Sequence, residues 1–250
     1  MELHPLAARF DAVAGNYERG RPDYPPAVVG ALMAELGLNP GDQVIDLAAG
    51  TGKLTRALLA EGLDVVGVEP QDAMRRILAE TVGPDRAIAG VAEAIPVAEA
   101  SQRAVTVADG FHWFDAPRAL ADIARVLVPG GGLALFATYP EWTGASWAHE
   151  LGSLLSEMRP EHPYFDGPSW AEAVAAAGGW EPLIEFEVKM NRPARAEAMG
   201  DYLMSMSWVA ALENDARAEM IERAETFVRE GETPEELPIH YRVGFTTRAL

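Results

Sequence analysis

The chain contains no cysteine among its 250 residues, which excludes a disulfide framework, a thiolate metal site and a cysteine nucleophile. It also lacks an apolar run that approaches the length needed to span a membrane. Residues 1–5 show neither the basic start nor the apolar core of a signal peptide. These absences predict a cytoplasmic protein that does not work in a membrane.

Basic residues are scarce, with 20 Lys and Arg against 38 Asp and Glu, so the formal net charge is −18. Nucleic-acid-binding proteins depend on Lys and Arg contacts with phosphates, and anionic membrane surfaces attract the same residues. This charge balance argues against both as partners. No HExxH or comparable ligand spacing is present, so we expect no metal site.

What the sequence does contain is 49% hydrophobic residues, enough for one sizeable core with or without a small cap. Between residues 27 and 140, short apolar strands alternate with amphipathic helices, which is typical of βαβ units and a parallel sheet. Strands are predicted at 43–47, 64–68, 86–89, 104–108 and 133–138, and helices at 27–36, 55–61, 72–80 and 117–127. A short helix at 9–17 precedes this region, and a sharp turn is predicted at 129–132.

After residue 140 the alternation is less regular, and most of the tryptophans lie there. Helices are predicted at 146–158, 169–177, 194–212 and 215–230, and strands at 183–189 and 238–246. We interpret the acidic run 230–236 as a solvated helix end and loop. Elements of this kind often shape a ligand pocket at the edge of a sheet.

The most informative segment is Asp46-Leu-Ala-Ala-Gly-Thr-Gly-Lys-Leu54, where an apolar strand ends in a loop of small residues that opens a helix. Glycines let backbone amides approach a ligand closely at the carboxyl end of such a sheet. Taken alone, the same residues also suit a tight turn without a ligand.

Glu69 ends the next predicted strand, 17 positions after Gly52. In nucleotide-binding α/β folds a carboxylate at this point accepts hydrogen bonds from ribose hydroxyls; the alternative is a solvated strand end. Both features also suit an NAD(P)-dependent oxidoreductase, but its phosphate-binding fingerprint requires a third glycine where Thr55 stands. A cofactor without a pyrophosphate does not need that glycine, so its absence argues against a dinucleotide.

The order of several segments resembles class I S-adenosylmethionine-dependent methyltransferases of the small-molecule type, near the trans-aconitate methyltransferase-like group. The segments are 10–17 with 21–25, 46–55, 68–74, 90–96, 111–115 and 125–131. The resemblance implies an α/β fold with a Rossmann-like, seven-stranded, mostly parallel sheet, one late antiparallel strand, helices on both faces and a helical cap from the C-terminal half. We therefore expect one domain over 1–250, with a cofactor-binding core at 27–140. Residues 1–26 and 141–250 would supply the cap, the last strands and the substrate-pocket elements.

The resemblance also implies which residues contact S-adenosylmethionine or its product, S-adenosylhomocysteine. The loop around Gly50 would face the methionine part, Glu69 the ribose, Pro70 and Met74 the adenine faces, and Ala92 with Glu93 the adenine edge. The remaining implied contacts are Asp46, Ala48, Thr51 and Gly52 in the loop, Asp109, Gly110 and Phe111 on the methionine side, and Tyr17 with Arg21 over the cofactor's carboxylate. Two positions depart from the family: Ala48 replaces a frequent first glycine, and Val91 replaces an aspartate that often holds the adenine amino group.

His112 follows the fourth predicted strand, and a histidine pKa of about 6.5 suits proton removal at neutral pH. The alternative is that His112 only shapes the pocket. Trp113 and Phe114 line the substrate pocket or pack as ordinary core residues. The sequence thus predicts methyl transfer to an oxygen, nitrogen or carbon of a small-molecule acceptor by in-line displacement, in a monomer or homodimer. The alternatives are an NAD(P)-dependent oxidoreductase and a non-catalytic, cofactor-binding relative that acts as an interaction subunit.

Overall fold

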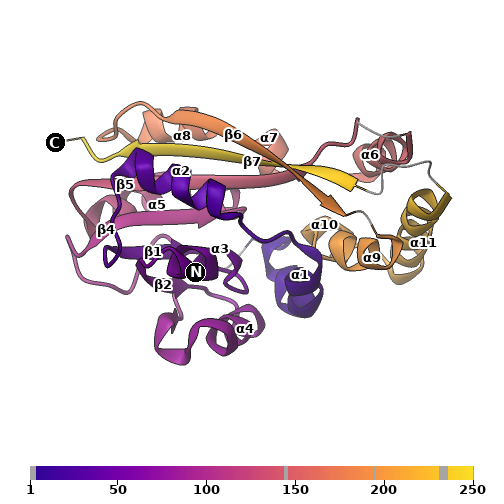
Figure 1. Ribbon diagram of the computed structural model, residues 1–250, viewed down its shortest axis with the longest axis horizontal. Coiled ribbons are helices and arrows are strands. Elements are labelled where there is room, and N and C mark those ends of the chain that lie inside the picture. Colours follow the sequence, from indigo (N-terminus) through magenta and orange to yellow (C-terminus); the bar gives the residue numbers. More distant parts are fainter. Residues whose placement is uncertain (1–3, 144–145, 194, 231–235, 250) are drawn as a thin grey trace. The chain divides into compact units, whose positions relative to one another are not determined.

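A computed structural model of the chain describes residues 4–143, 146–193, 195–230 and 236–249. Its central feature is a seven-stranded sheet in the order β3-β2-β1-β4-β5-β7-β6 (Figure 1). The strands are β1 Gln43–Leu47, β2 Asp64–Val68, β3 Ala87–Ile88, β4 Gln102–Ala108, β5 Leu127–Pro140, β6 Ile184–Pro193 and β7 Glu236–Thr247. The first five strands pair in parallel, so the carboxyl ends of β1, β2 and β4 share one edge.

Strand β7 runs antiparallel to β5. The Arg248 N–H donates to the Gly131 carbonyl at 3.0 Å, whereas the Glu141 N–H donates to the Pro238 carbonyl at 2.8 Å. Residue numbers therefore rise along β5 while they fall along β7, which is the antiparallel arrangement. The predicted fold class, a mostly parallel Rossmann-like sheet with one late antiparallel strand, is confirmed.

Helices connect most strands. Their bounds are α1 Ala14–Gly20, α2 Pro26–Leu36, α3 Lys53–Ala60, α4 Asp72–Val82, α5 Ala116–Val126, α6 Ser146–Met158, α7 Pro163–Asp166, α8 Trp170–Ala177, α9 Ala196–Met204, α10 Ser207–Ala210 and α11 Asn214–Glu230, with 3-10 turns η1 Ala7–Val13, η2 Pro84–Arg86 and η3 Phe111–Trp113. Local signals explain several ends. Helix α2 stops at Gly37, whose φ of 59° closes the last turn, and α8 begins with a capping box between Ser169 and Glu172.

Two predictions about local structure are wrong. The single helix expected at 194–212 is divided into α9 and α10, because Met206 adopts an extended conformation (φ −88°, ψ 124°) and the Ser205 hydroxyl donates to the Tyr202 carbonyl. The sharp turn expected at 129–132 lies inside β5, where the register against β4 jumps from Gln102–Leu127 to Ala104–Gly132 and forms a bulge. Most of the acidic run 230–236 lies outside the described residues.

The chain forms two compact units, and their boundaries fall within β5, β6 and β7. The sheet unit comprises residues 23–137, 166–187 and 242–250. Its core contains fully buried side chains from the first strands and from the helices that contact one another in chain order, α2 with α3 and α3 with α4. Gly67 on β2 allows the close approach of α4, because a Cβ at Gly67 would lie 2.8 Å from Leu78 Cδ2.

The helical unit comprises residues 1–22, 138–165 and 188–241. Helix α9 contacts α1 on one side and α11 on the other, and α11 also contacts α6 (Figure 1). Leu151, Leu203, Val209 and Met220 are at most 1% exposed and form its core. Across the described ranges of both units, no helix combines the length and the apolar character that crossing a membrane requires.

Candidate functional site

The loop between β1 and α3 has an unusual backbone conformation. Ala48, Gly50 and Gly52 have φ angles of 55°, 58° and 88°, in the left-handed region that glycine adopts most easily. The Gly52 N–H donates to the Ala49 carbonyl at 2.9 Å, which closes the turn. Ala48 therefore adopts the conformation expected of a glycine at this turn, at a steric cost of about 1–2 kcal/mol for an alanine in this region.

Glu69, at the end of β2, is connected directly to this loop. The Gly50 N–H donates to Glu69 Oε2 and the Gln71 N–H donates to Oε1, both at 2.9 Å. The side chain is only 4% exposed, so it is not a solvated strand end. Burial raises the pKa of Glu69 to about 7, against the opposing effect of these two hydrogen bonds. Each carboxylate oxygen keeps a further lone pair for a ligand hydroxyl.

Asp46 lies under the loop and has no exposed surface. The Thr55 hydroxyl donates to Asp46 Oδ2 at 2.6 Å, and the Thr106 hydroxyl lies 3.2 Å from Oδ1. Burial raises the pKa of Asp46 to about 6 despite these hydrogen bonds. Thr55, at the position of the missing third glycine, thus ties α3 to β1 through Asp46.

Thr51 offers a polar atom that the protein does not use. Its side chain is fully buried, and within the described parts of the chain its hydroxyl oxygen has no hydrogen-bond partner. Buried hydroxyls are normally hydrogen-bonded, because desolvating one without a partner is unfavourable. Together with the acceptor capacity of Glu69, this orphaned hydroxyl fits a ligand that carries both hydroxyl and charged polar groups.

The segment after β4 packs against the glycine loop. A Cβ at Gly110 would lie 3.0 Å from Ala48 Cβ, so the structure brings these two predicted residues together. Asp109 has a φ of 51°, its N–H donates to the Phe136 carbonyl at 2.9 Å, and the Tyr24 hydroxyl donates to its carboxylate at 3.4 Å. Phe111 is 6% exposed and closes this side.

The residues predicted around an adenine occupy two segments. Met74, on the first turn of α4 shortly after Pro70, is 2% exposed, and Ala92 is 3% exposed. The Glu93 carboxylate accepts a hydrogen bond from the Asp115 N–H at 2.9 Å, which engages it at the start of α5. Val91 lies in a tight turn in which the Ala94 N–H donates to its carbonyl at 3.2 Å.

His112, Trp113 and Phe114 follow in and after η3, and all three are half-buried. The His112 and Trp113 rings have centroids 4.4 Å apart, and Phe114 contacts Phe111 edge-on at 5.9 Å. The catalytic role of His112 and the pocket roles of the two aromatic residues stay predictions. Over the described ranges, no cluster of three or more His, Asp or Glu side chains has the geometry to hold a metal ion.

Tyr17 and Arg21 belong to the helical unit. The Arg21 guanidinium lies 5.6 Å from the Tyr17 ring centroid and 5.8 Å from that of Tyr202, and its Nη2 donates to the Ser205 carbonyl at 3.4 Å. Tyr17 lies on α1 and Arg21 is the extended residue that caps its C-terminus, where the Arg21 N–H donates to the Tyr17 carbonyl at 3.0 Å. Tyr202 was missed, because no sequence pattern connects it with residues 180 positions earlier.

The strand order, the glycine loop after β1 and the acidic residue after β2 define the Rossmann-like fold of class I methyltransferases. The family model described as a methyltransferase domain matches residues 45–135 of this chain. An uncharacterized methyltransferase of Mycobacterium tuberculosis is 34% identical over 219 residues, covering 87% of this chain and 84% of the relative. An uncharacterized methyltransferase-like protein of Schizosaccharomyces pombe is 28% identical over 225 residues, with 88% and 87% covered.

Among solved structures, a putative type II methyltransferase from Anaeromyxobacter dehalogenans has a similar fold. It superposes with a TM-score of 0.65 at 21% identity, covering 92% of this chain and 97% of the other. The chain belongs to the S-adenosylmethionine-dependent methyltransferase family.

Proposed function

We propose that this methyltransferase acts on a small-molecule acceptor and methylates an oxygen, nitrogen or carbon nucleophile by in-line displacement. The single observation that carries the methyl-transfer part of the proposal is the buried Glu69 carboxylate, hydrogen-bonded to the amide of Gly50 in a loop whose Thr51 hydroxyl has no partner among the described residues. The net charge of −18 supports a small acceptor over nucleic acid. The resemblance to the trans-aconitate methyltransferase-like group supports the same acceptor class.

The proposal assigns the cofactor to the loop residues and the carboxyl ends of β1, β2 and β4. When bound there, S-adenosylmethionine would supply an activated methyl group on a positively charged sulfur, with a neutral thioether as the leaving group. Glu69 accepts hydrogen bonds from the ribose hydroxyls, and the Thr51 hydroxyl and the amides around Gly50 bind the methionine part. Asp46 orients the loop from below through Thr55 rather than by direct contact.

We further propose that residues 27–140 form the cofactor-binding core of a single domain over 1–250, active as a monomer or homodimer. The other segments then supply the cap, the last strands and the acceptor pocket. Within the core, Pro70, Met74, Ala92 and Glu93 surround the adenine. Asp109, Gly110 and Phe111 line the methionine side, supported by the 3.0 Å approach of Gly110 to Ala48.

His112 is the proposed general base when the acceptor nucleophile carries a proton, which passes to the imidazole as the new bond to the methyl carbon forms. We expect His112→Ala to slow the formation of S-adenosylhomocysteine at least tenfold with a panel of phenol and amine acceptors. Its affinity for the cofactor should change less than threefold. His149→Ala, at an exposed position on α6, is the matched control. Equal rates for His112→Ala and the wild type would remove His112 from the mechanism.

The proposed cofactor site is tested by ligand-dependent stability. S-adenosylhomocysteine should raise the melting temperature and NADH should not, because a ligand stabilises the state that binds it.

Glu69→Ala should weaken S-adenosylhomocysteine binding about tenfold or more in titration calorimetry, through loss of charge-assisted hydrogen bonds. Glu80→Ala, at an exposed position on α4, should leave the affinity unchanged. Stabilisation by NADH would instead support the oxidoreductase, and cofactor binding without turnover would support the non-catalytic relative.

A further inference from the structure

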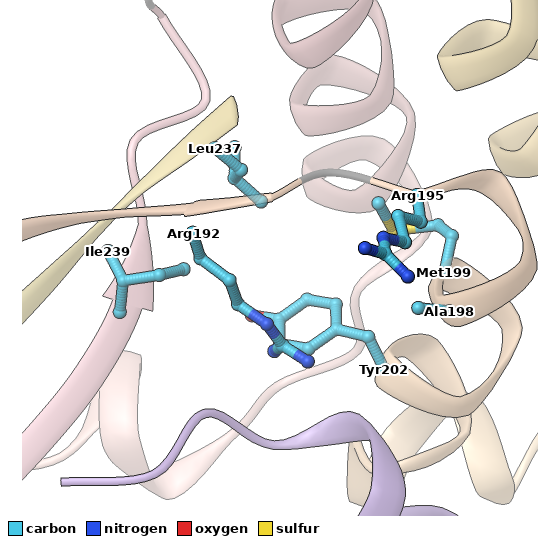
Figure 2. Close-up of a pocket in the computed structure, with 7 residues that line it drawn as sticks. All are labelled: Arg192, Arg195, Ala198, Met199, Tyr202, Leu237 and Ile239. Atoms are coloured by element: carbon cyan, nitrogen blue, oxygen red, sulfur yellow. The ribbon is translucent and has the colours of Figure 1, made fainter. Parts of the chain in front are cut away.

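Arginine side chains hold backbone carbonyls at several places in this chain, and a small hollow in the helical unit contains one of them. Figure 2 shows Arg192, Tyr202 and Ile239 around this hollow. Arg192 Nη1 donates to the Gly20 carbonyl at 2.7 Å, and the side chains of Met199, Tyr202 and Ile239 are at most 6% exposed. The guanidinium there holds the end of α1 beside a packed wall, which is a structural role.

In the sheet unit, Arg75 makes the same kind of contact directly beside the candidate site. It lies on the first turn of α4, and its Nη1 donates to the Glu69 carbonyl at 2.9 Å and to the Pro70 carbonyl at 3.1 Å. The guanidinium therefore reaches back over the turn that joins β2 to α4. That turn carries the carboxylate proposed to bind the ribose and the proline proposed to flank the adenine.

The backbone and the carboxylate of Glu69 are both restrained by hydrogen bonds. The Glu69 N–H donates to the Ile88 carbonyl on β3 at 2.9 Å, and the Glu69 carbonyl accepts from Arg75. The carboxylate accepts from the N–H groups of Gly50 and Gln71. Of these four hydrogen bonds, the one from Arg75 comes from a side chain. A substitution can therefore remove it and leave the other donors and acceptors in place.

Arg75 also brings a positive charge to a buried carboxylate. Burial raises the pKa of Glu69 to about 7, and the charge of Arg75 is among the influences that oppose this increase. Asp46 faces Glu69 from β1 and adds to the increase, while Asp72 on α4 forms an ion pair with Arg75. Among the described side chains around Glu69, Arg75 is thus the cation that favours the ionised carboxylate.

We infer that Arg75 is a positioning residue for cofactor binding, which fixes the turn after β2 and supplies the positive charge that supports the Glu69 carboxylate. The inference rests on the proposed function, in which Glu69 accepts hydrogen bonds from the ribose hydroxyls. Geometry and charge can be tested separately. Lysine keeps the charge but not the planar guanidinium, and methionine keeps an apolar stem without the charge.

The ionisation of Glu69 is measured in the cofactor-free protein by carbon-13 NMR titration of the glutamate carboxyls, with Glu69→Gln identifying the signal. Arg75→Met should raise the titration midpoint by about half a pH unit or more, because a nearby cation favours the ionised form. A purely structural role predicts the opposite shift, because loosening the turn admits water and lowers the pKa toward its ordinary value. Arg75→Gln, a second neutral variant that keeps hydrogen-bond donors, should also raise the midpoint.

Two further variants serve as controls for charge. Arg75→Lys, which keeps the charge, should stay within about 0.3 pH unit of the wild type. Arg76→Met makes the same substitution at the neighbouring, exposed position of α4 and should not move the midpoint.

Titration calorimetry with S-adenosylhomocysteine then tests the consequence for binding. At pH 7, Arg75→Met should bind about fivefold more weakly or worse, because fewer Glu69 side chains are ionised and the turn is less ordered. Arg75→Lys should bind about threefold more weakly at pH 7 and at pH 8.5 alike, because only the geometry of the turn is changed. Arg76→Met should bind like the wild type.

The inference is overturned if Arg75→Met leaves the Glu69 midpoint unchanged or lowers it, or if this variant binds S-adenosylhomocysteine as tightly as Arg76→Met does. If the cofactor product binds to the wild type while the midpoint does not move in Arg75→Met, the inference fails and the proposed function stands. If the midpoint rises as expected but the wild type binds no S-adenosylhomocysteine, the proposed function fails and the action of Arg75 on Glu69 stands.

Discussion

At the scale of single residues, Glu69 shows how burial turns an ordinary carboxylate into one that titrates near neutral pH. Burial raises its pKa to about 7, and repulsion from Asp46 adds to the increase. Two backbone N–H groups, from Gly50 and Gln71, favour the ionised form but do not outweigh the loss of water. A hydroxyl-bearing ligand donates to the ionised form, so its binding should be coupled to the release of a proton.

The affinity for S-adenosylhomocysteine should therefore depend on pH. Below pH 7 the protonated Glu69 must ionise before it accepts ribose hydroxyls, so affinity should rise by up to about tenfold per pH unit toward pH 7. Above about pH 7.5 the carboxylate is already ionised, and affinity should level off. Titration calorimetry between pH 5.5 and 8.5 measures this profile. Glu69→Gln should bind more weakly with a flat profile, and a flat profile in the wild type would contradict the assignment.

At the scale of elements, α5 orders the segment around residues 93–97. Arg125 on α5 donates to the Ile95 carbonyl at 2.8 Å and the Val97 carbonyl at 3.0 Å, and Asp122 accepts from the Ile95 N–H at 2.5 Å. The hydrogen bond from Arg125 holds the pKa of Asp122 below its usual range. One helix face thus satisfies the backbone of a segment that has little regular structure of its own.

Arg125→Gln should loosen this segment without unfolding the sheet. We expect the Ile95 and Val97 amides to exchange hydrogen at least tenfold faster. Without the guanidinium, the segment can open locally without breaking the hydrogen bonds that Arg125 makes in the wild type. Affinity for S-adenosylhomocysteine should fall about threefold to tenfold, since the proposed adenine edge is less ordered. Arg118→Gln, at an exposed position of the same helix, is the control. Unchanged exchange in Arg125→Gln would show that α5 does not order the segment.

At the scale of the whole chain, the helical unit is assembled from segments that are far apart in sequence. Helix α1 packs on α9, where Asp201 accepts hydrogen bonds from Arg19 and Asn16. Gly20 permits this contact, because a Cβ there would lie 2.4 Å from the carbonyl carbon and oxygen of Asp201. Those are backbone atoms, which cannot rotate away as a flexible side chain can.

Gly20→Ala should therefore destabilise the protein by about 2 kcal/mol or more, as overpacking of a close contact does. Gly30→Ala is the matched control, because nothing lies within 4 Å of a Cβ at that exposed helical position. That variant should be more stable than the wild type by about 0.5–1 kcal/mol, from the higher helix propensity of alanine. Denaturant unfolding followed by tryptophan fluorescence compares the three proteins. A Gly20→Ala protein as stable as the wild type would show that α1 and α9 separate readily.

Local patterns in the chain were sufficient to predict β1 and β2 at their observed bounds and the glycine loop between β1 and α3. Short apolar runs bounded by turn residues restrict the backbone whatever lies around them. The break at Ser205–Met206 and the bulge within β5 were mispredicted, because helix packing and strand register, rather than local propensity, set them.

The chemistry of the candidate site depends on contacts between residues distant in sequence. The burial of Glu69 and the hydrogen bond from Thr55 to Asp46 both require the folded chain. The bounds of β1 and β2 and the glycine loop are thus encoded in short stretches of sequence, since backbone preferences act over a few residues. The raised pKa values of Glu69 and Asp46 arise only on folding, because desolvation depends on what surrounds a side chain in space.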